Sequence, residues 1–338
     1  MQIEKNELRR DPISGSWTVV IHNTGKLEEL LQPIDNASVQ VEKKIILEQY
    51  GAGDEILRIM EEGATDEKSW LLKVVAGQHP VLQIHGALNN RGKGLYDVCD
   101  GVGAHEIVIE SREPGIPFEA FDVAHLTKLL TAYSARILDL KKDDRFRYIM
   151  VHKKQYGFNS ISGNRAISHI VATPITPLGI RLKLESCLRH FKYKERCLFC
   201  DIIYQEQDSE ERLITENDAF VAISPFAATV PFHMMILPKD HEPFFEKNEK
   251  LNQLAEILKD VLNRFKTVTG QNAYEILINS APNLESAKRR GYWKTLTNDY
   301  HWHLEILPTL KFKNNLNEDV GFPINFVSPE KVTRLLQQ

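Results

Sequence analysis

The most restrictive feature of this sequence is an order of elements that occurs twice. In the first half, strands and one long amphipathic helix are expected at residues 71–75, 106–110, 120–140, 148–151 and 166–173. In the second half, the corresponding elements are expected at residues 220–224, 234–237, 249–266, 274–279 and 300–307. In each half the last strand carries histidine and ends at a proline. Self-similarity of this kind predicts an internal duplication of one α+β unit.

The chain length agrees with a duplication. A chain of 338 residues is too long for one ordinary small domain and long enough to bury a large core. We predict an α+β fold with an N-terminal unit over residues 1–180 and a C-terminal unit over residues 181–338. Each unit is expected to be an antiparallel sheet with packed helices. The join is expected at residues 178–194, and residues 30–68 are interpreted as loop and short helix.

Charge and composition exclude several classes of protein. The formal net charge of -4 comes from interleaved signs, which does not favour nucleic acid as a partner. The opening MQIEKNELRR is charged from its fourth residue, and no run of about 18 apolar residues occurs. Neither a secretory signal nor a membrane span is therefore expected. Four cysteines in such a chain do not predict a disulfide framework, so we expect a cytoplasmic location.

Two of the cysteines form a candidate metal site. Cys197 and Cys200 have the C-x-x-C spacing at which two thiolates from one tight turn reach one metal ion. A tetrahedral site needs two more ligands, and His241 and His301 are the candidates because each is expected at a strand end of the same repeat. The pair alone also allows a simpler interpretation, in which the cysteines are buried packing and the histidines lie at the surface.

The last predicted strand of the second repeat carries alternating polar residues. His301, His303 and Glu305 are spaced two apart, so on a strand all three side chains point to one face. A row of imidazoles suits phosphate chemistry, since one histidine can attack phosphorus while a neighbour orients it or binds metal. Paired histidines on a strand are also commonly structural.

Five segments carry a more specific signal. They are ELRRDPISGSW at 7–17, GLYD with GVGAHE at 94–106, CLFC at 197–200, FAATVPF through LPKDH at 226–241, and YHWHLE at 300–305. In this order they resemble the galactose-1-phosphate uridylyltransferase family of the histidine-triad superfamily. The resemblance implies two histidine-triad-like repeats and, in the second repeat, a zinc ion bound by Cys197, Cys200, His241 and His301. We therefore predict one Zn²⁺ per chain.

The first repeat departs from the family pattern at the reacting residue. Family members carry His-Pro-His or His-Ser-His before a Gln, and the second His takes the nucleotidyl group covalently. Alignment on residues 170–174 places Arg165 and Ile167 on the two histidines and His169 on the Gln. Isoleucine has no lone pair with which to attack phosphorus. Ordinary uridylyl transfer through this position is therefore not expected.

Other features of the first repeat are missing too. No cysteine precedes Trp70, and the histidine of the family's first zinc site is replaced near Pro114. The loop that cradles phosphate in the family reads KKQYG at 153–157, and the sugar-binding segment near the C-terminus is shortened. The losses are concerted rather than accidental.

Three functions stay open. The first is a protein resembling UDP-glucose:hexose-1-phosphate uridylyltransferase whose altered chemistry uses His169 or His303. The second is a catalytically inactive protein that binds a nucleotide or nucleotide sugar, and the third is a zinc-stabilised scaffold. For binding, we expect Lys153, Lys154, Arg165 and His169 to converge on one opening and attract phosphate. The resemblance also implies a homodimer.

Overall fold

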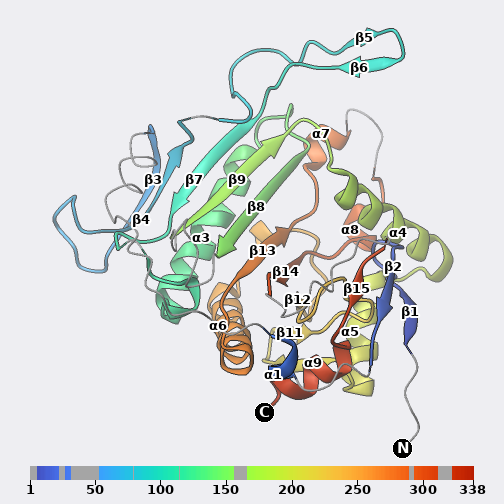
Figure 1. Cartoon of the computed structure of the whole chain (residues 1–338). Coiled ribbons are helices and arrows are strands. Elements are labelled where there is room, and N and C mark those ends of the chain that lie inside the picture. The colour runs from blue at the N-terminus through green and yellow to red at the C-terminus, as the bar shows by residue number, and fades with distance from the viewer. Residues whose placement is uncertain are drawn as a thin grey trace, which may run out of the picture.

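The structure is a computed structural model that describes residues 6–22, 27–31, 53–78, 80–113, 115–155, 166–288, 293–310 and 322–338. Within these residues the largest element is a ten-stranded antiparallel sheet in the spatial order β10-β11-β12-β14-β13-β8-β9-β7-β4-β3 (Figure 1). The first-half strands are β3 (Glu55–Met60), β4 (Trp70–Ala76), β7 (Ala104–Ile109), β8 (Tyr148–Gln155) and β9 (Ile167–Thr173). The second-half strands are β10 (Leu213–Glu216), β11 (Phe220–Ile223), β12 (Met234–Pro238), β13 (Tyr274–Asn279) and β14 (His303–Pro308).

The strand order confirms the predicted duplication. From one edge inward the first half runs β3-β4-β7-β9-β8, and from the other edge the second half runs β10-β11-β12-β14-β13. Each strand thus has a counterpart at the same depth in the sheet. The halves join where β8 pairs with β13, from Gln155 opposite Tyr274 at one end to Val151 opposite Ile278 at the other. The α+β fold of two antiparallel repeats is confirmed, and the two sheets form one continuous surface.

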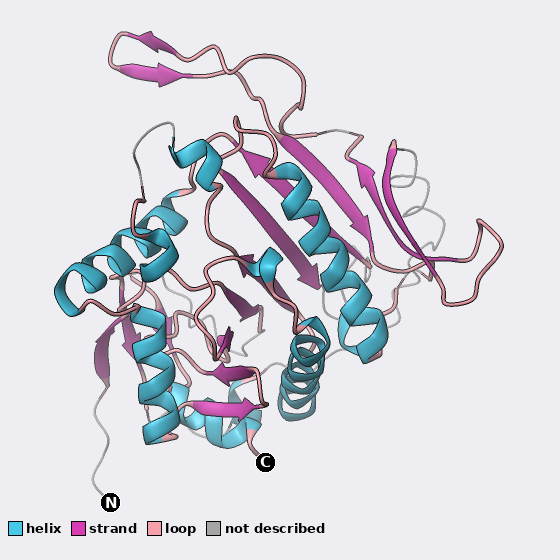
Figure 2. Ribbon diagram, turned by 180° about the vertical axis from the view of Figure 1, so that it is seen from behind, coloured by secondary structure: helices cyan, strands magenta, loops and turns pink. Residues whose placement is uncertain are grey.

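Two long helices cover one face of this sheet. They are α3 (Val123–Leu140) and α6 (Leu251–Thr269), seen in front of the sheet in Figure 2. Asp122 caps α3 by accepting a hydrogen bond from the backbone N–H of His125 at 2.7 Å. Leu126, Leu129 and Ile137 follow at helical spacing and are fully buried against the strands. Burial of each such side chain contributes about 1.5–3 kcal/mol, so this apolar stripe fixes which face α3 occupies.

The opposite face of the sheet differs between the halves. Over the second half it is covered by α4 (Leu178–Lys194) and α5 (Leu198–Ser209), which bury a separate apolar cluster containing Phe199 and Leu237. Over the first half, β7, β9 and β8 face the viewer in Figure 1 without a described helix in front of them. We call this surface the open face. Its imidazole side chains are reached from solvent.

The remaining described elements complete the molecule. They are β1 (Glu7–Arg10), β2 (Trp17–Val20), β5 (Arg91–Lys93), β6 (Tyr96–Val98), β15 (Ile324–Asn325), α1 (Leu27–Leu30), α7 (Leu284–Lys288), α8 (Leu296–Asp299), α9 (Pro329–Leu336) and 3-10 turns at Phe118–Ala120 and Phe245–Lys247. β1, β2 and β15 form a small sheet. Arg9 donates to Glu330 at 2.7 Å and to the carbonyl of Phe226 at 3.1 Å. The first strands of the chain therefore pack with the second repeat, and the boundary at residue 180 stays a prediction.

Two segments differ from the sequence-based expectation. Residues 30–68 were expected to be loop and short helix, but β3 lies within them and pairs with β4 at the sheet edge. Residues 32–52 lie outside the described part of the chain. The expected join at residues 178–194 is the helix α4, which ends at Glu195 in a left-handed conformation with φ 54°. In the part of the chain that the structure describes, no helix combines the length and apolar character that crossing a membrane requires.

Candidate functional site

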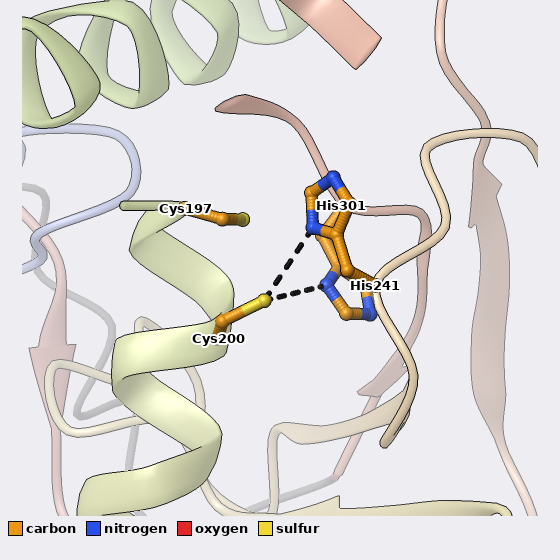
Figure 3. Close-up of side chains that lie close together, drawn as sticks. All are labelled: Cys197, Cys200, His241 and His301. Atoms are coloured by element: carbon orange, nitrogen blue, oxygen red, sulfur yellow. Dashed lines mark hydrogen bonds between the residues drawn. The ribbon is translucent and has the colours of Figure 1, made fainter. Parts of the chain in front are cut away.

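Helix α5 and two strand ends bring four predicted metal ligands together. Cys197 is the N-cap residue of α5 and Cys200 lies in its first turn, so both sulfur atoms are at the start of one helix. His241 follows β12 and His301 directly precedes β14, and these strands are neighbours in the sheet. The four potential ligand atoms lie within 4.8 Å of one another (Figure 3). The sequence-based grouping of these residues is therefore what the fold produces.

The geometry of the group fits a tetrahedral metal site. The sulfur of Cys200 is 3.4 Å from Nδ1 of His241 and 3.6 Å from Nδ1 of His301. With zinc–sulfur bonds of about 2.3 Å and zinc–nitrogen bonds of about 2.0–2.1 Å, the expected sulfur–nitrogen edge is about 3.6 Å. A divalent zinc-like ion therefore fits between these donors without a large rearrangement.

Each imidazole is also held in the tautomer that a metal requires. Nε2 of His301 donates to the carbonyl of Pro238 at 2.9 Å, and Nε2 of His241 donates to the carbonyl of Thr297 at 3.1 Å. The lone pair on Nδ1 of each ring then points toward the sulfur of Cys200, as outer hydrogen bonds commonly arrange in metal sites. The hydrogen bond from Cys197 is the largest cause that lowers the pKa of Cys200, to about 3, and the nearby His241 and His301 act in the same direction. A thiolate is thus present to bind a cation.

The matching place in the first repeat contains an apolar cluster. Strand register makes Ile167 the counterpart of His301, and Ser111 the counterpart of His241. Ile167 is 6% exposed and belongs to a cluster of buried side chains on this face, Trp70, Val75, Ile107 and Ile109, with Met60 beside it. Pro114 lies outside the described residues. Apolar packing thus occupies the place that a metal site has in the second repeat.

The open face carries a pair of facing imidazoles. His105 on β7 and His169 on β9 are half-buried, and Nε2 of His105 is 3.1 Å from Nδ1 of His169. Burial, with the nearby His105, His152 and Lys153, lowers the pKa of His169 to about 4. His169 is therefore a neutral hydrogen-bonding group at physiological pH. The sequence singled out His169, whereas His105 was expected only to brace its strand.

Two further residues extend this row toward the second repeat. His152 on β8 lies directly opposite His169 in the ladder between β8 and β9. Its Nε2 is 3.3 Å from a carboxylate oxygen of Glu275, whose other oxygen is 2.8 Å from Nζ of Lys154. Glu275 belongs to β13. The sequence-based search missed His152 and Glu275, because their partnership depends on the joint between the repeats and the local sequence does not show it.

The predicted phosphate-binding lysines separate in the structure. Lys154 is on the open face, partly exposed and paired with Glu275. Lys153 is 2% exposed and points to the opposite face, where its ammonium is 2.6 Å from Glu110. The predicted convergence of Lys153 with His169 on one opening is therefore wrong, because neighbouring residues of a strand point to opposite faces. Arg165 lies outside the described residues.

His303 is also unavailable to a substrate in this structure. Its ring is fully buried and packs 4.6 Å from the ring of Phe199, centroid to centroid. Nδ1 donates to the carbonyl of His301, and Nε2 accepts from Lys183 at 3.1 Å. Burial lowers the pKa of His303 to about 3. Helix α4 covers this part of the sheet, so the structure favours a structural position for His303, and its catalytic role stays a prediction.

Comparisons with known proteins agree with this architecture. Residues 183–324 match the galactose-1-phosphate uridyl transferase C-terminal domain. ADP-glucose phosphorylase of Arabidopsis thaliana is 26% identical over 98% of this chain and 92% of its own length. Galactose-1-phosphate uridylyltransferase of Thermotoga maritima is 25% identical over 74% of this chain and 79% of its own. The crystal structure of an Arabidopsis thaliana ADP-glucose phosphorylase with bound ADP-glucose has a TM-score of 0.76, with 26% identity and 99% of both chains covered.

The duplicated sheet and the matched domain make the chain similar to nucleotide-sugar transferases in sequence and fold. Within that class, residues 183–324 match the C-terminal domain of galactose-1-phosphate uridyl transferase, and the chain is similar to members of that family along most of its length, as its sequence motifs predicted. It departs from the family's sequence pattern at Ile167. The chemistry of this chain must therefore be argued from its own residues.

Proposed function

We propose that the protein binds a nucleotide or nucleotide sugar on the open face of the first repeat. The carrying observation is the half-buried His169, whose Nδ1 is 3.1 Å from Nε2 of His105, a contact that holds the ring in place on this face. Lys154, partly exposed on the same face and paired with Glu275, is a cation that a phosphate group can approach. The likeness to an ADP-glucose phosphorylase along nearly the whole chain supports this ligand class.

The altered chemistry is part of the same proposal. Ile167 is packed among apolar side chains and cannot form a bond to phosphorus. We expect no nucleotidyl adduct at residue 167, in contrast with the reaction that the family resemblance implies. Mass mapping after incubation with UDP-glucose or ADP-glucose tests this expectation directly.

Calorimetry tests the binding proposal. We expect ADP-glucose or UDP-glucose to bind with measurable heat, and binding to weaken about tenfold in His169→Ala, the loss of about one hydrogen bond to a charged group. Added salt should weaken binding as well, since the phosphate charge is screened. His85→Ala is the matched control, because His85 is exposed and outside the row. Absence of heat at millimolar ligand would refute the proposal.

Zinc is proposed as the metal of the Cys197 site. A borderline ion with a preference for mixed sulfur and nitrogen ligands and four-coordinate geometry suits this donor set. When bound, zinc supplies structural cross-linking of α5 to the strand ends, since all four positions are taken by protein. A reducing compartment keeps such thiols available, so a cytoplasmic location is part of the proposal. Elemental analysis of the purified protein should give about one zinc per chain.

One observation favours the alternative of a catalytically inactive protein or a zinc-stabilised scaffold. Hairpin β5–β6 projects from the body of the molecule in both Figure 1 and Figure 2, and Leu95 and Tyr96 at its turn are 96% and 73% exposed. Exposed apolar side chains on such an arm are typical of a protein contact. The homodimer that the family resemblance implies would supply one. Light scattering of wild type against Leu95→Ser tests that assembly.

A further inference from the structure

The hydrogen positions on His105 and His169 follow from their surroundings. Among the residues that the structure describes, Nδ1 of His105 is buried and has no hydrogen-bond partner. A proton there would be a buried N–H without an acceptor, which is costlier and rarer than an unused lone pair. The proton of His105 is therefore on Nε2, which donates to Nδ1 of His169 at 3.1 Å. Neutral His169 then carries its own proton on Nε2, so it presents a donor on the open face.

His152 differs from His169 in which ring nitrogen has a protein partner. Nε2 of His152 is 3.3 Å from Oε2 of Glu275, and an ionised carboxylate only accepts hydrogen bonds. Burial raises the pKa of Glu275, but the hydrogen bond from Lys154 and the nearby His152 outweigh it and leave that pKa below its ordinary value. Glu275 is therefore ionised at neutral pH. The proton of neutral His152 sits on Nε2, and Nδ1 carries the lone pair.

The donor on Nε2 of His169 and the lone pair on Nδ1 of His152 belong to neighbouring strands. His152 and His169 are directly opposite in the ladder, where side chains begin about 4.5–5.5 Å apart. The titratable groups around His152 come from three strands: His169 from β9, Glu275 from β13 and Lys154 from its own strand. His152 is 29% exposed, so its ring is reached from solvent while Glu275 limits its rotation.

We propose that His152, oriented by Glu275, is the nucleophile of this protein in place of the residue lost at Ile167. The inference rests on the proposed binding of a nucleotide sugar to the open face. A nucleophile at this site needs a lone pair, a fixed ring and a third group that stabilises the charge formed, and His152 and Glu275 supply all three. His169 occupies the place of the family's Gln and donates a hydrogen bond to a phosphate oxygen.

The reaction proceeds in two steps with balanced charge. Nδ1 of His152 attacks the α-phosphorus, a nitrogen–phosphorus bond forms, and the phosphorus–oxygen bond to the sugar phosphate breaks, with the electron pair leaving on that oxygen. The ring becomes a cation whose Nε2–H stays hydrogen-bonded to the Glu275 carboxylate. An oxygen acceptor, either water or inorganic phosphate, then attacks phosphorus. The nitrogen–phosphorus bond breaks, its electron pair returns to Nδ1, and the acceptor releases any proton it carried to solvent.

Labelling of the full-length protein tests this assignment. Incubation with ADP-glucose carrying radioactive α-phosphate is followed by alkaline quenching, which preserves phosphoramidates, and by peptide mapping. We expect the label on His152 and its loss by at least about 100-fold in His152→Asn. His85→Asn is the matched control and should label as wild type does. Metal content and circular dichroism show whether each variant is folded, and mapping of the wild type does not depend on any variant.

A second variant isolates the positioning role of Glu275. In Glu275→Gln we expect labelling to slow about tenfold or more, because the amide no longer stabilises the imidazolium. Glu275→Asp keeps the carboxylate, so labelling should recover in part in that variant, which a purely structural role of the longer side chain would not cause.

The possible outcomes separate the two proposals. Calorimetric binding of ADP-glucose with label on another residue, or with no label at all, overturns the role of His152 and leaves the binding proposal intact. Labelling of Glu275→Gln at the wild-type rate overturns the role of Glu275. Absence of binding at millimolar ADP-glucose overturns both.

Discussion

The two repeats share a strand order but carry different side chains at matching places on both faces of their sheet. On the face that carries the metal group in the second repeat, His301 has Ile167 as its counterpart in the first. On the helix-covered face, fully buried Trp302 packs on Phe220 and Phe245, whereas its counterpart Ser168 bonds to Tyr133. A repeat of this fold is therefore stable with either a metal group or an apolar cluster at the same place.

On the helix-covered face of the first repeat, two buried charged side chains form an ion pair. Lys153 and Glu110 form an ion pair at 2.6 Å with 2% and 0% of their side chains exposed. Burial raises the pKa of Glu110 and Lys153 opposes that shift, so each charge depends on the other. Such a pair adds little net stability compared with apolar packing, but loss of one partner leaves an uncompensated charge. The two repeats thus contain different kinds of vulnerable site.

The largest effect is expected at the metal group of the second repeat. Cys200→Ser should abolish metal binding and lower the free energy of unfolding by about 5 kcal/mol or more, because metal binding energy at such a site is also folding energy. Elemental analysis and urea denaturation measure both quantities. Cys99→Ser is the control, since Cys99 is an exposed free thiol away from the group. Unchanged metal content in Cys200→Ser would contradict the site.

The next effect concerns the buried pair of the first repeat. Lys153→Met should destabilise the protein by about 3–5 kcal/mol, because Glu110 is then buried without its cation. The double variant Lys153→Met/Glu110→Leu should recover much of that loss. Urea denaturation of the three proteins forms the comparison. A double variant no more stable than the single one would show that the cluster matters through other contacts.

A smaller loss of stability is expected when Ile167 is replaced by histidine, the residue at the matching place of the second repeat. Ile167→His should cost about 1–3 kcal/mol, because an imidazole without a partner replaces an apolar side chain in the cluster. It should not create a second metal site, since the counterpart of His241 is Ser111. Ile167→Val, with an expected cost of about 0.5–1.5 kcal/mol, controls for packing alone. A second equivalent of bound metal in Ile167→His would contradict the expectation that the first repeat lacks the other ligands of a metal site.

The smallest effect is a pH dependence on the open face. The pKa of His169 is lowered to about 4 by burial and by nearby positive groups, whereas its ordinary value is 6.5. Between these values the unfolded chain binds a proton at this position and the folded chain does not, so its contribution to stability is full above about pH 6.5 and is lost as the pH falls toward 4.

The variant His169→Gln removes that contribution. Its free energy of unfolding should fall less steeply with acid than that of wild type between about pH 6.5 and 4. Urea denaturation across this range measures the slope. His85→Gln, at an exposed position, should keep the wild-type slope. Equal slopes for wild type and His169→Gln would mean that His169 titrates normally in the folded protein.

Much of the fold could be predicted because its signals are local. Helical spacing of Leu126, Leu129 and Ile137 marked α3, and prolines after the last strand of each repeat marked the strand ends. The duplicated order of elements indicated two repeats. Strand β3 was missed because it is an edge strand with an exposed or half-exposed side chain at every position, which weakens the apolar signal.

The two parts of the candidate site differed in predictability. The metal group was found because C-x-x-C is a local motif and its histidines lie at recognisable strand ends. The placement of Lys153 was mispredicted because adjacent strand residues were assigned to one opening. Glu275 could not be connected to His152 from sequence, since 123 residues separate them and only the pairing of β8 with β13 brings them together.

The pairing of β8 with β13 also determines how the chain can be divided. Each of these strands would be a bare edge if its repeat were expressed alone, with unpaired backbone N–H and C=O groups along its length. Such edges recruit other strands and promote aggregation. In the intact chain each repeat covers the other's edge, and within the described residues the outer strands of the sheet are β3 and β10. The duplication thus protects the molecule against self-association through the middle of its sheet.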